Sequence, residues 1–268
     1  MATVILVRHG RTTANVQGIL AGRAPGVLLD EVGQEQAART AERLAAVPFV
    51  GVVSSPLERC RQTAAAILEA QPADAPIRSL EAAAEAAAAV ALPIAIDEAL
   101  TECGYGQWQG RALKELSKEP LWSVVQNQPS AAVFPDGEAM AGMQARAVAA
   151  IRGHDAAVEA EHGAGAVWVA VSHGDVIKAI LADALGMHLD LFQRIAVGPA
   201  SVSIVRYGSS RPEVIATNTD AGDLSWLRAA APAGDAPVGG GAGHPEPGEE
   251  APPKSTAAEP AGAGPGLE

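Results

Sequence analysis

The sequence contains few cysteines and few aromatic residues, and it has no long apolar run. Cys60 and Cys103 are its two cysteines, and they form no spaced set typical of a zinc site or a disulfide framework, so a reducing cytoplasm is the simplest location. The longest apolar stretches have the length of a strand or consist mainly of alanine, and no basic segment followed by a hydrophobic one opens the sequence. We therefore expect neither a membrane span nor a signal peptide.

Basic residues are also in deficit. The net charge of −12 argues against nucleic acid as a partner. A phosphate-binding site would therefore have to create its own local positive field. Hydrophobic residues make up 48% of the 268 residues, which is ample for a sizeable core in one large or two small domains. Whether the chain forms a homodimer stays open at this point.

The last part of the sequence differs in composition from the rest. From Ala229 onward it consists of alanine, glycine, proline and acidic residues, with no apolar period. Such a segment cannot bury enough apolar surface to offset the entropy lost on ordering. We therefore predict a folded domain over residues 1–228 and a disordered, solvated tail over 229–268. Within the domain, the alanine-rich stretch at 72–92 predicts an inserted surface helix.

The first apolar run ends in a group of polar residues. Thr3 to Val7 is a short, largely β-branched run that predicts a strand buried on both faces, and Arg8-His9-Gly10 follows directly. Ligands of open α/β sheets bind just outside the carboxyl ends of the strands. Glycine lets backbone and ligand approach closely there, and an arginine beside a histidine indicates an anion.

The same arrangement recurs later in the chain. Residues 166–172 predict another buried strand, which ends in Ser172-His173-Gly174. If the two strands are neighbours in a parallel sheet, both imidazoles overhang one crevice. Arg59, in the first turns of a helix that follows the strand at 49–54, would complete a cationic cup, because its planar guanidinium can donate two parallel hydrogen bonds to a phosphate.

The remaining elements are predicted from capping residues and periodicity. Asp30 is a helix N-cap, and Ser55, Pro56 and Glu58 match the N-cap, N1 and capping-box positions of the helix that contains Arg59. The residues from Thr12 to Leu29 predict a loop that helps to wall a pocket. Further elements are a strand at 94–97, a helix at 112–127 broken at Pro120, helices at 138–161 and 176–185, and a closing hairpin at 201–207 and 214–218.

Four motifs together resemble the signature of the histidine phosphatase superfamily, the phosphoglycerate-mutase-like enzymes. They occur in the family's order between residues 3 and 218. The resemblance implies a three-layer α/β/α sandwich with a mostly parallel central sheet, and an activity that needs no metal or other cofactor. The motifs are Arg8-His9-Gly10, Ser55-Pro56-Leu57-Glu58-Arg59 with Gln62-Thr63, Leu100-Thr101-Glu102 with Gly106, Trp108 and Gly110, and Ser172-His173-Gly174.

The resemblance also implies a role for each site residue. His9 would be the nucleophile that takes the phosphoryl group of a small phosphomonoester to form a phosphohistidine. Glu102 would protonate the leaving group, with a pKa raised by the nearby phosphate dianion. Arg8, Arg59 and His173 would neutralise the charge on the transferred phosphoryl group. Residues implied at the substrate end are Thr12, Thr13, Asn15, Gly22, Tyr105 and Gly174.

Several alternatives remain after the sequence is read in this way. A phosphomutase of the phosphoglycerate mutase type would return the phosphoryl group to a bound product instead of to water. The stretch from Ala112 to Phe134 lacks the paired arginines with which such mutases grip a second anionic group, which favours a phosphatase. A non-catalytic phosphoester-binding module is disfavoured because all five core groups are present. Oxidation of Cys60 or Cys103 as a switch is a further alternative to buried, structural thiols.

Overall fold

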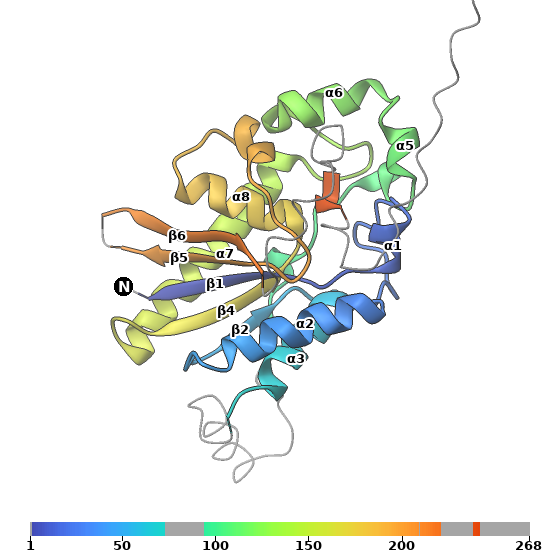
Figure 1. The fold of residues 1–268 in the computed structure, drawn as a ribbon. Coiled ribbons are helices and arrows are strands. Elements are labelled where there is room, and N and C mark those ends of the chain that lie inside the picture. Colours follow the sequence, from blue (N-terminus) through green and yellow to red (C-terminus); the bar gives the residue numbers. More distant parts are fainter. Residues whose placement is uncertain (1, 73–93, 209, 221–237, 242–268) are drawn as a thin grey trace, which may run out of the picture.

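The computed structural model describes residues 2–72, 94–208, 210–220 and 238–241, and this part contains a six-stranded sheet (Figure 1). The order is β3-β2-β4-β1-β5-β6. The pairs β1–β4, β2–β4 and β2–β3 are parallel, and β5 runs antiparallel to both of its neighbours. The predicted mostly parallel sheet is therefore confirmed. The strands are β1 (Thr3–Arg8), β2 (Val52–Ser54), β3 (Ile94–Ile96), β4 (Val167–Ser172), β5 (Val202–Tyr207) and β6 (Pro212–Thr219).

Helices cover both faces of this sheet, which gives the predicted three layers (Figure 1). Side chains of β1 alternate between the faces, as in any strand. Ile5 and Val7 pack with α2 (Glu31–Leu44) and α3 (Glu58–Glu69), whereas Val4 and Leu6 pack on the side of α7 and α8. The other helices are α1 (Thr13–Val16), α5 (Leu113–Leu116), α6 (Pro120–Asn127), α7 (Met140–His162) and α8 (Gly174–Ala184), and the 3₁₀ turns are Glu98–Leu100, Gly106–Trp108, Pro129–Ala131, Leu189–Arg194 and Val238–Gly240.

The strand register places the two predicted histidines side by side. Arg8, the last residue of β1, lies opposite Ser172, the last residue of β4. His9 and His173 therefore follow at the same edge of the sheet, and the backbone N–H of His9 donates to the carbonyl of Ser172 at 3.0 Å. The expectation that both imidazoles overhang one crevice is confirmed.

One predicted helix start is wrong. Asp30 caps α2 as expected, with its carboxylate accepting from Gly33 N–H, but α3 begins at Glu58 and has Leu57 as an N-cap without a side-chain hydrogen bond. Ser55 therefore lies ahead of the helix, although its hydroxyl still accepts from the backbone N–H of Leu57 at 3.4 Å. The same hydroxyl hydrogen-bonds to the Nε2 atom of His173 at 2.7 Å, and both groups are buried at the strand ends.

The loop after β1 passes very close to α2. A Cβ atom on Gly10 would lie 2.3 Å from the carbonyl oxygen of Gly33, and a Cβ on Gly33 would lie 2.0 Å from the carbonyl oxygen of Arg11. Gly10 was expected to allow close approach of a ligand, but the group that approaches it is the backbone of α2. This contact leaves no space for a side chain on either glycine.

The predicted disordered tail needs a correction. Residues 238–241 fall inside the segment predicted as solvated, yet Val238 is 1% exposed and belongs to the main hydrophobic core. The composition of the segment does not indicate this contact, because the burial of Val238 depends on residues that are distant in the sequence. The rest of the tail and the alanine-rich stretch at 73–93, which includes most of the predicted insertion at 72–92, lie outside the described residues. The boundary at residue 228 stays a prediction.

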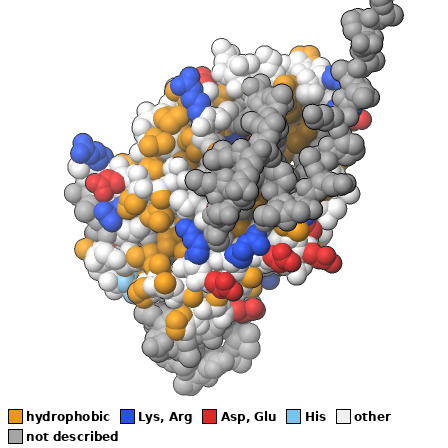
Figure 2. All heavy atoms as spheres, viewed as in Figure 1, with side chains coloured by type: hydrophobic (Ala, Val, Ile, Leu, Met, Phe, Trp, Pro, Cys, Tyr) orange, Lys and Arg blue, Asp and Glu red, His pale blue; other side chains and the backbone are white. Residues whose placement is uncertain are grey.

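One face of the described part carries side chains of all kinds. On the face seen in Figure 2, apolar, acidic and basic side chains are interspersed. Among the described residues, no helix is both long enough and apolar enough to span a bilayer.

Candidate active site

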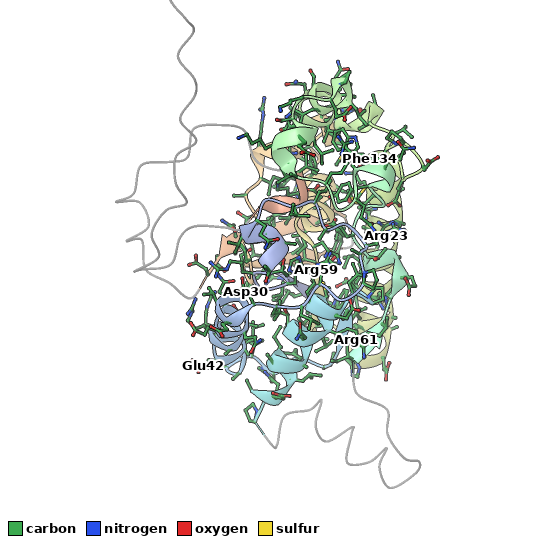
Figure 3. All side chains as sticks on the ribbon, turned by 90° about the vertical axis from the view of Figure 1, so that its right-hand side faces the viewer. Arg23, Asp30, Glu42, Arg59, Arg61 and Phe134 are labelled. Carbon is green, nitrogen blue, oxygen red and sulfur yellow. The ribbon has the colours of Figure 1, made fainter. Side chains whose placement is uncertain are left out.

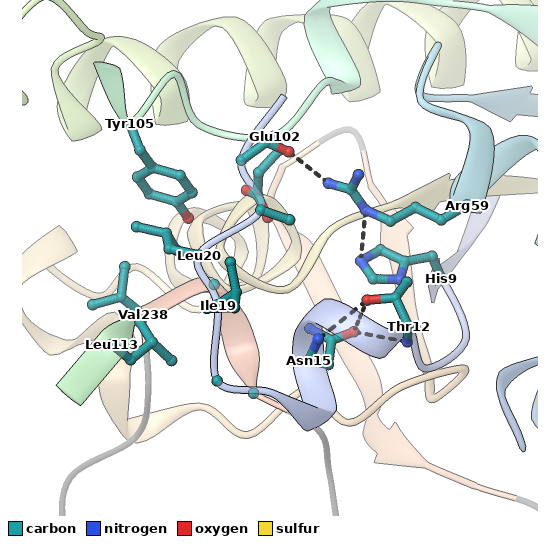
Figure 4. A pocket seen from close by; sticks show the side chains of 15 residues that line it. His9, Thr12, Asn15, Ile19, Leu20, Arg59, Glu102, Tyr105, Leu113 and Val238 are labelled. Carbon is teal, nitrogen blue, oxygen red and sulfur yellow. Dashed lines mark hydrogen bonds between the residues drawn. The ribbon is translucent and has the colours of Figure 1, made fainter. Parts of the chain in front are cut away.

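A cavity of about 30 Å³ opens at the carboxyl edge of the sheet (Figure 4). The histidine, arginine and glutamate in its lining are His9, Arg59 and Glu102, which are each at most 3% exposed. Arg8 and His173 are fully buried and outside the cavity lining, and the ring of His173 lies 5.3 Å from that of His9. The structure thus brings together the five groups predicted to form the catalytic core. The other lining residues are Thr12, Asn15, Gly18, Ile19, Leu20, Ala21, Gly22, Tyr105, Leu113, Val238, Gly239 and Gly241.

Hydrogen bonds to His9 assign its tautomer. The Nδ1 atom lies 2.7 Å from the carbonyl oxygen of Gly10, so Nδ1 carries the proton and donates it there. The Nε2 atom accepts from Nε–H of Arg59 at 3.3 Å. Burial, followed by the charges of Arg59 and Arg8, lowers the pKa of His9 well below its usual range. The Nε2 lone pair is therefore available at neutral pH, as nucleophilic attack requires.

Arg59 connects several parts of the site. Besides His9, its Nη2 atom donates to the carbonyl of Gly22 at 2.8 Å and lies 3.3 Å from Nδ1 of His173. Its Nη1 atom is buried and has no hydrogen-bond partner among the described residues. Such a buried donor is costly unless an acceptor arrives, and phosphate oxygens are suited to a guanidinium. Figure 3 shows Arg59 near the centre of the molecule, whereas Arg61 of the same helix is exposed.

His173 is neutral in this arrangement. Burial is the largest reason that its pKa lies well below its usual range, and the charge of Arg59 is the next. Its Nδ1 atom lies 4.0 Å from the Glu102 carboxylate, but a neutral imidazole forms no ion pair there. The expectation that His173 neutralises phosphoryl charge thus requires a phosphate dianion to raise its pKa, as nearby negative charge does.

Glu102 has the raised pKa that the sequence predicted, for a different reason. Burial and the nearby carboxylate of Asp175 raise the pKa of Glu102 to about 7, against the opposing charge of Arg59. One carboxylate oxygen accepts from the backbone N–H of Cys103 at 2.9 Å. A proton donor near neutrality is therefore already present without any contribution from substrate charge.

A second polar cluster lies below the cavity and was missed in the sequence. Asp175 is fully buried, and it accepts from the Tyr105 hydroxyl at 2.8 Å and from the backbone N–H of Gly239 at 2.9 Å. Lys178 lies 3.9 Å from the same carboxylate. The signal was present: Asp175 directly follows the Ser172-His173-Gly174 motif, but spacing alone does not show which polar residues are buried.

The predicted substrate-end residues separate into two groups. Thr12 and Asn15 line the cavity and hold each other through a capping box at the start of α1, and Gly22 and Tyr105 line it as well. Thr13 is exposed and Gly174 is buried at the start of α8, and neither lines the cavity. Their placement in the structure does not match the predicted substrate contacts.

The two cysteines lie next to the site but are buried. Cys60 and Cys103 are both 0% exposed, and burial raises the pKa of Cys60 to about 12 and that of Cys103 still further. Thiols of this kind are little ionised at neutral pH and are poor redox sensors. Among the described residues, no group of three or more His, Cys, Asp or Glu side chains is arranged to hold a metal ion.

This geometry agrees with comparisons to known proteins. A family model for the histidine phosphatase superfamily (branch 1) matches residues 4–81 and 75–220. The chain belongs to this superfamily. Relatives include a protein named probable phosphoglycerate mutase GpmB from Yersinia enterocolitica, which is 29% identical over 78% of this chain and 87% of its own length. A bifunctional protein of Mycobacterium tuberculosis is 30% identical over 76% of this chain, which spans only 50% of that relative.

Two solved structures of proteins named as phosphatases have a similar fold. The alpha-ribazole phosphatase from Shigella flexneri is 26% identical, with a TM-score of 0.63 over 81% of this chain and 96% of its own. A mycobacterial glucosyl-3-phosphoglycerate phosphatase, 24% identical, has a TM-score of 0.67 over 81% of this chain and 99% of its own. The predicted family and the predicted fold class are both confirmed.

Proposed function

We propose that this histidine phosphatase hydrolyses a small phosphomonoester through a phosphohistidine on His9, without a metal. The observation that supports this most directly is the pair of hydrogen bonds at His9. With Nδ1–H donated to Gly10 and Nε2 facing Arg59, the imidazole presents a lone pair beside an unpartnered guanidinium donor. An anionic phosphoryl group placed between them meets a nucleophile and a counter-charge at once.

The reaction follows from these positions in two steps. In the first, Nε2 of His9 bonds to phosphorus while the ester P–O bond breaks, and protonated Glu102 gives its proton to the departing alkoxide. In the second, water attacks the phosphohistidine, Glu102 takes the proton from that water, and the N–P bond breaks to release phosphate. Arg59 and Arg8 stabilise the charge on the phosphoryl oxygens in both steps.

A phosphomutase is the second candidate, because one relative is named as a probable phosphoglycerate mutase. A mutase substrate of that type has a carboxylate that needs its own cation. Within the described residues, two arginines that adjoin lining residues in the chain already have carboxylate partners: Arg11 pairs with Asp30 at 2.9 Å and Arg23 with Glu138 at 2.8 Å. This supports the phosphatase over the mutase.

The test is an assay of the purified protein with p-nitrophenyl phosphate in EDTA, beside His9→Ala and a control, His162→Ala. His162 is an exposed histidine at the end of α7. Loss of the nucleophile should lower kcat by ~10⁴-fold or more, and the control should behave like the unaltered protein. A quenched reaction should contain a phosphorylated His9 peptide by mass spectrometry. Activity that survives His9→Ala, or that needs added metal, contradicts the proposal.

Two further assays address the alternatives. Interconversion of 2- and 3-phosphoglycerate without release of phosphate would identify the mutase. Binding of inorganic phosphate without turnover of any phosphomonoester would identify a non-catalytic module. A cytoplasmic location and a homodimer remain predictions, which cell fractionation and sedimentation would test.

A further inference from the structure

A short segment near the end of the chain forms part of the active-site wall. The Val238–Gly241 segment lies about 230 residues after β1 in the sequence, yet it supplies Val238, Gly239 and Gly241 to the cavity lining (Figure 4). The Val238 side chain is 1% exposed and belongs to the same hydrophobic core cluster as Leu20 and Tyr105. The segment is therefore buried in the site and does not merely pass over it.

Two buried charged groups hold this segment. The Nη2 atom of Arg8 lies 2.6 Å from the carbonyl oxygen of Gly241 and 3.4 Å from that of Gly239, while Nη1 donates to the carbonyl of Val197. On the other side, the N–H of Gly239 donates to the carboxylate of Asp175 at 2.9 Å. Buried charged groups that lose their hydrogen-bond partners are costly, so these contacts favour a permanent wall over a displaceable plug.

The glycine run is explained by the path that the backbone takes. Gly239 has φ +76° and Gly241 has φ +56°, a region that side chains disfavour. A Cβ atom on Gly239 would also lie 3.1 Å from Cδ1 of Leu20. Gly239 and Gly241 are therefore two positions in this glycine-rich segment at which the backbone conformation favours glycine.

We propose that the Val238–Gly241 segment is a built-in wall of the active site, which positions Arg8 and closes the leaving-group end through the side chain of Val238. This inference rests on the proposed phosphatase function. The Nη1 atom of Arg8 donates to the carbonyl of Val197, and its Nη2 atom contacts two carbonyls of this segment, so the segment fixes where the charge of Arg8 lies relative to His9. Val238 lies with Leu20 and Leu113 on the side of the cavity opposite His9 (Figure 4), where it limits the size of the departing alcohol.

The first experiment compares two shortened chains with the full chain. One ends at Pro237 and lacks the segment, and the other ends at Pro245 and keeps it, so the second is the matched control. The readouts are kcat and KM with phenyl phosphate and 1-naphthyl phosphate, the inhibition constant of inorganic phosphate, and the far-UV circular dichroism melt.

The Pro245 chain should match the full chain. The Pro237 chain should fold but bind inorganic phosphate ~10-fold more weakly and lose ~10- to 100-fold in kcat/KM, because Arg8 is no longer positioned. Equal constants for the two shortened chains would overturn the inference. A rise in kcat/KM for the Pro237 chain would overturn it as well, because it would show that the segment blocks the site.

Point variants keep the inference testable if the Pro237 chain does not fold. Val238→Ala retains the backbone contacts to Arg8, so inhibition by inorganic phosphate should stay unchanged while the preference for 1-naphthyl over phenyl phosphate rises ~5- to 10-fold. An unchanged preference would contradict the role of Val238. Gly239→Val should weaken phosphate inhibition. Gly186→Val, a control with φ +66° and open space around it, should not.

The His9→Ala assay separates this inference from the function on which it rests. If His9→Ala abolishes activity while the two shortened chains behave alike, only the inference about the segment fails. If His9→Ala stays active, the proposed mechanism itself fails.

Discussion

The phosphate end and the leaving-group end of the cavity are built in different ways. At the phosphate end, His9, Arg59 and their neighbours are charged or polar, buried, and joined by hydrogen bonds at the ends of β1 and β4. At the leaving-group end, Ile19, Leu20 and Leu113 come from loops and from the short helix α5, and Val238 comes from the distant C-terminal segment (Figure 4).

The difference follows from what each end has to recognise. A phosphoryl group is the same in every phosphomonoester, so the groups that bind it can be fixed in the rigid sheet. The alcohol differs between substrates, and it is met by segments whose length and sequence can vary without disturbing the sheet. Variants of the groups that bind the phosphoryl group should therefore affect all substrates alike. Variants of the proton donor or of the leaving-group end should change the preference among substrates.

The largest effect in this comparison is expected for Glu102→Gln. Loss of the general acid should lower kcat ~10²- to 10⁴-fold for alkyl phosphates, and much less for p-nitrophenyl phosphate, whose phenolate leaves without a proton. The pKa of Glu102 is about 7, and the protonated form is the active one. For the unaltered protein, kcat/KM with alkyl phosphates should thus fall as pH rises through about 7, and Glu102→Gln should lack this decline.

The control for this prediction is Glu98→Gln, an exposed glutamate in the preceding 3₁₀ turn. It should change neither kcat nor the pH profile. Equal losses for Glu102→Gln with alkyl and p-nitrophenyl esters would show that Glu102 is not the proton donor.

A somewhat smaller effect is expected for Arg59→Ala. Removal of this guanidinium should lower kcat/KM ~10²- to 10³-fold by the same factor for every ester, because it acts on the common phosphoryl group. The inhibition constant of orthovanadate should weaken in parallel. Arg61→Ala on the same helix removes an exposed arginine and should leave both quantities unchanged. If the loss in kcat/KM of Arg59→Ala varied strongly with the alcohol of the ester, the two ends of the cavity would not act separately.

The smallest effect is expected for Leu113→Ala at the leaving-group end. This variant should change kcat/KM ~3- to 10-fold for bulky aryl phosphates, with little change for methyl phosphate, because only the larger group reaches the apolar wall. Leu185→Ala, in which the replaced leucine is 48% exposed at the end of α8, serves as the control. Inhibition by inorganic phosphate should not respond to either variant, and a change with Leu113→Ala would show that the ends are coupled.

The phosphate end could be predicted from the sequence because its signal is local. A strand followed by His and Gly occurs twice, and parallel pairing then brings His9 and His173 together. The start of α3 was misplaced because Ser-Pro-x-Glu is a valid helix-cap pattern, and the sequence does not show that the hydroxyl of Ser55 also meets the buried His173. Val238 was missed because its neighbours in sequence are Pro and Gly, and its neighbours in space come from far along the chain.

The contact between Gly10 and Gly33 limits which substitutions the active site can accept during evolution. Each glycine faces a backbone carbonyl and not a side chain, so no smaller neighbour could make room for a substitution at either position. The backbone contact thus fixes the distance between α2 and the loop that carries His9. Loops on the far side of the cavity can diverge toward new alcohols while the nucleophile keeps its place.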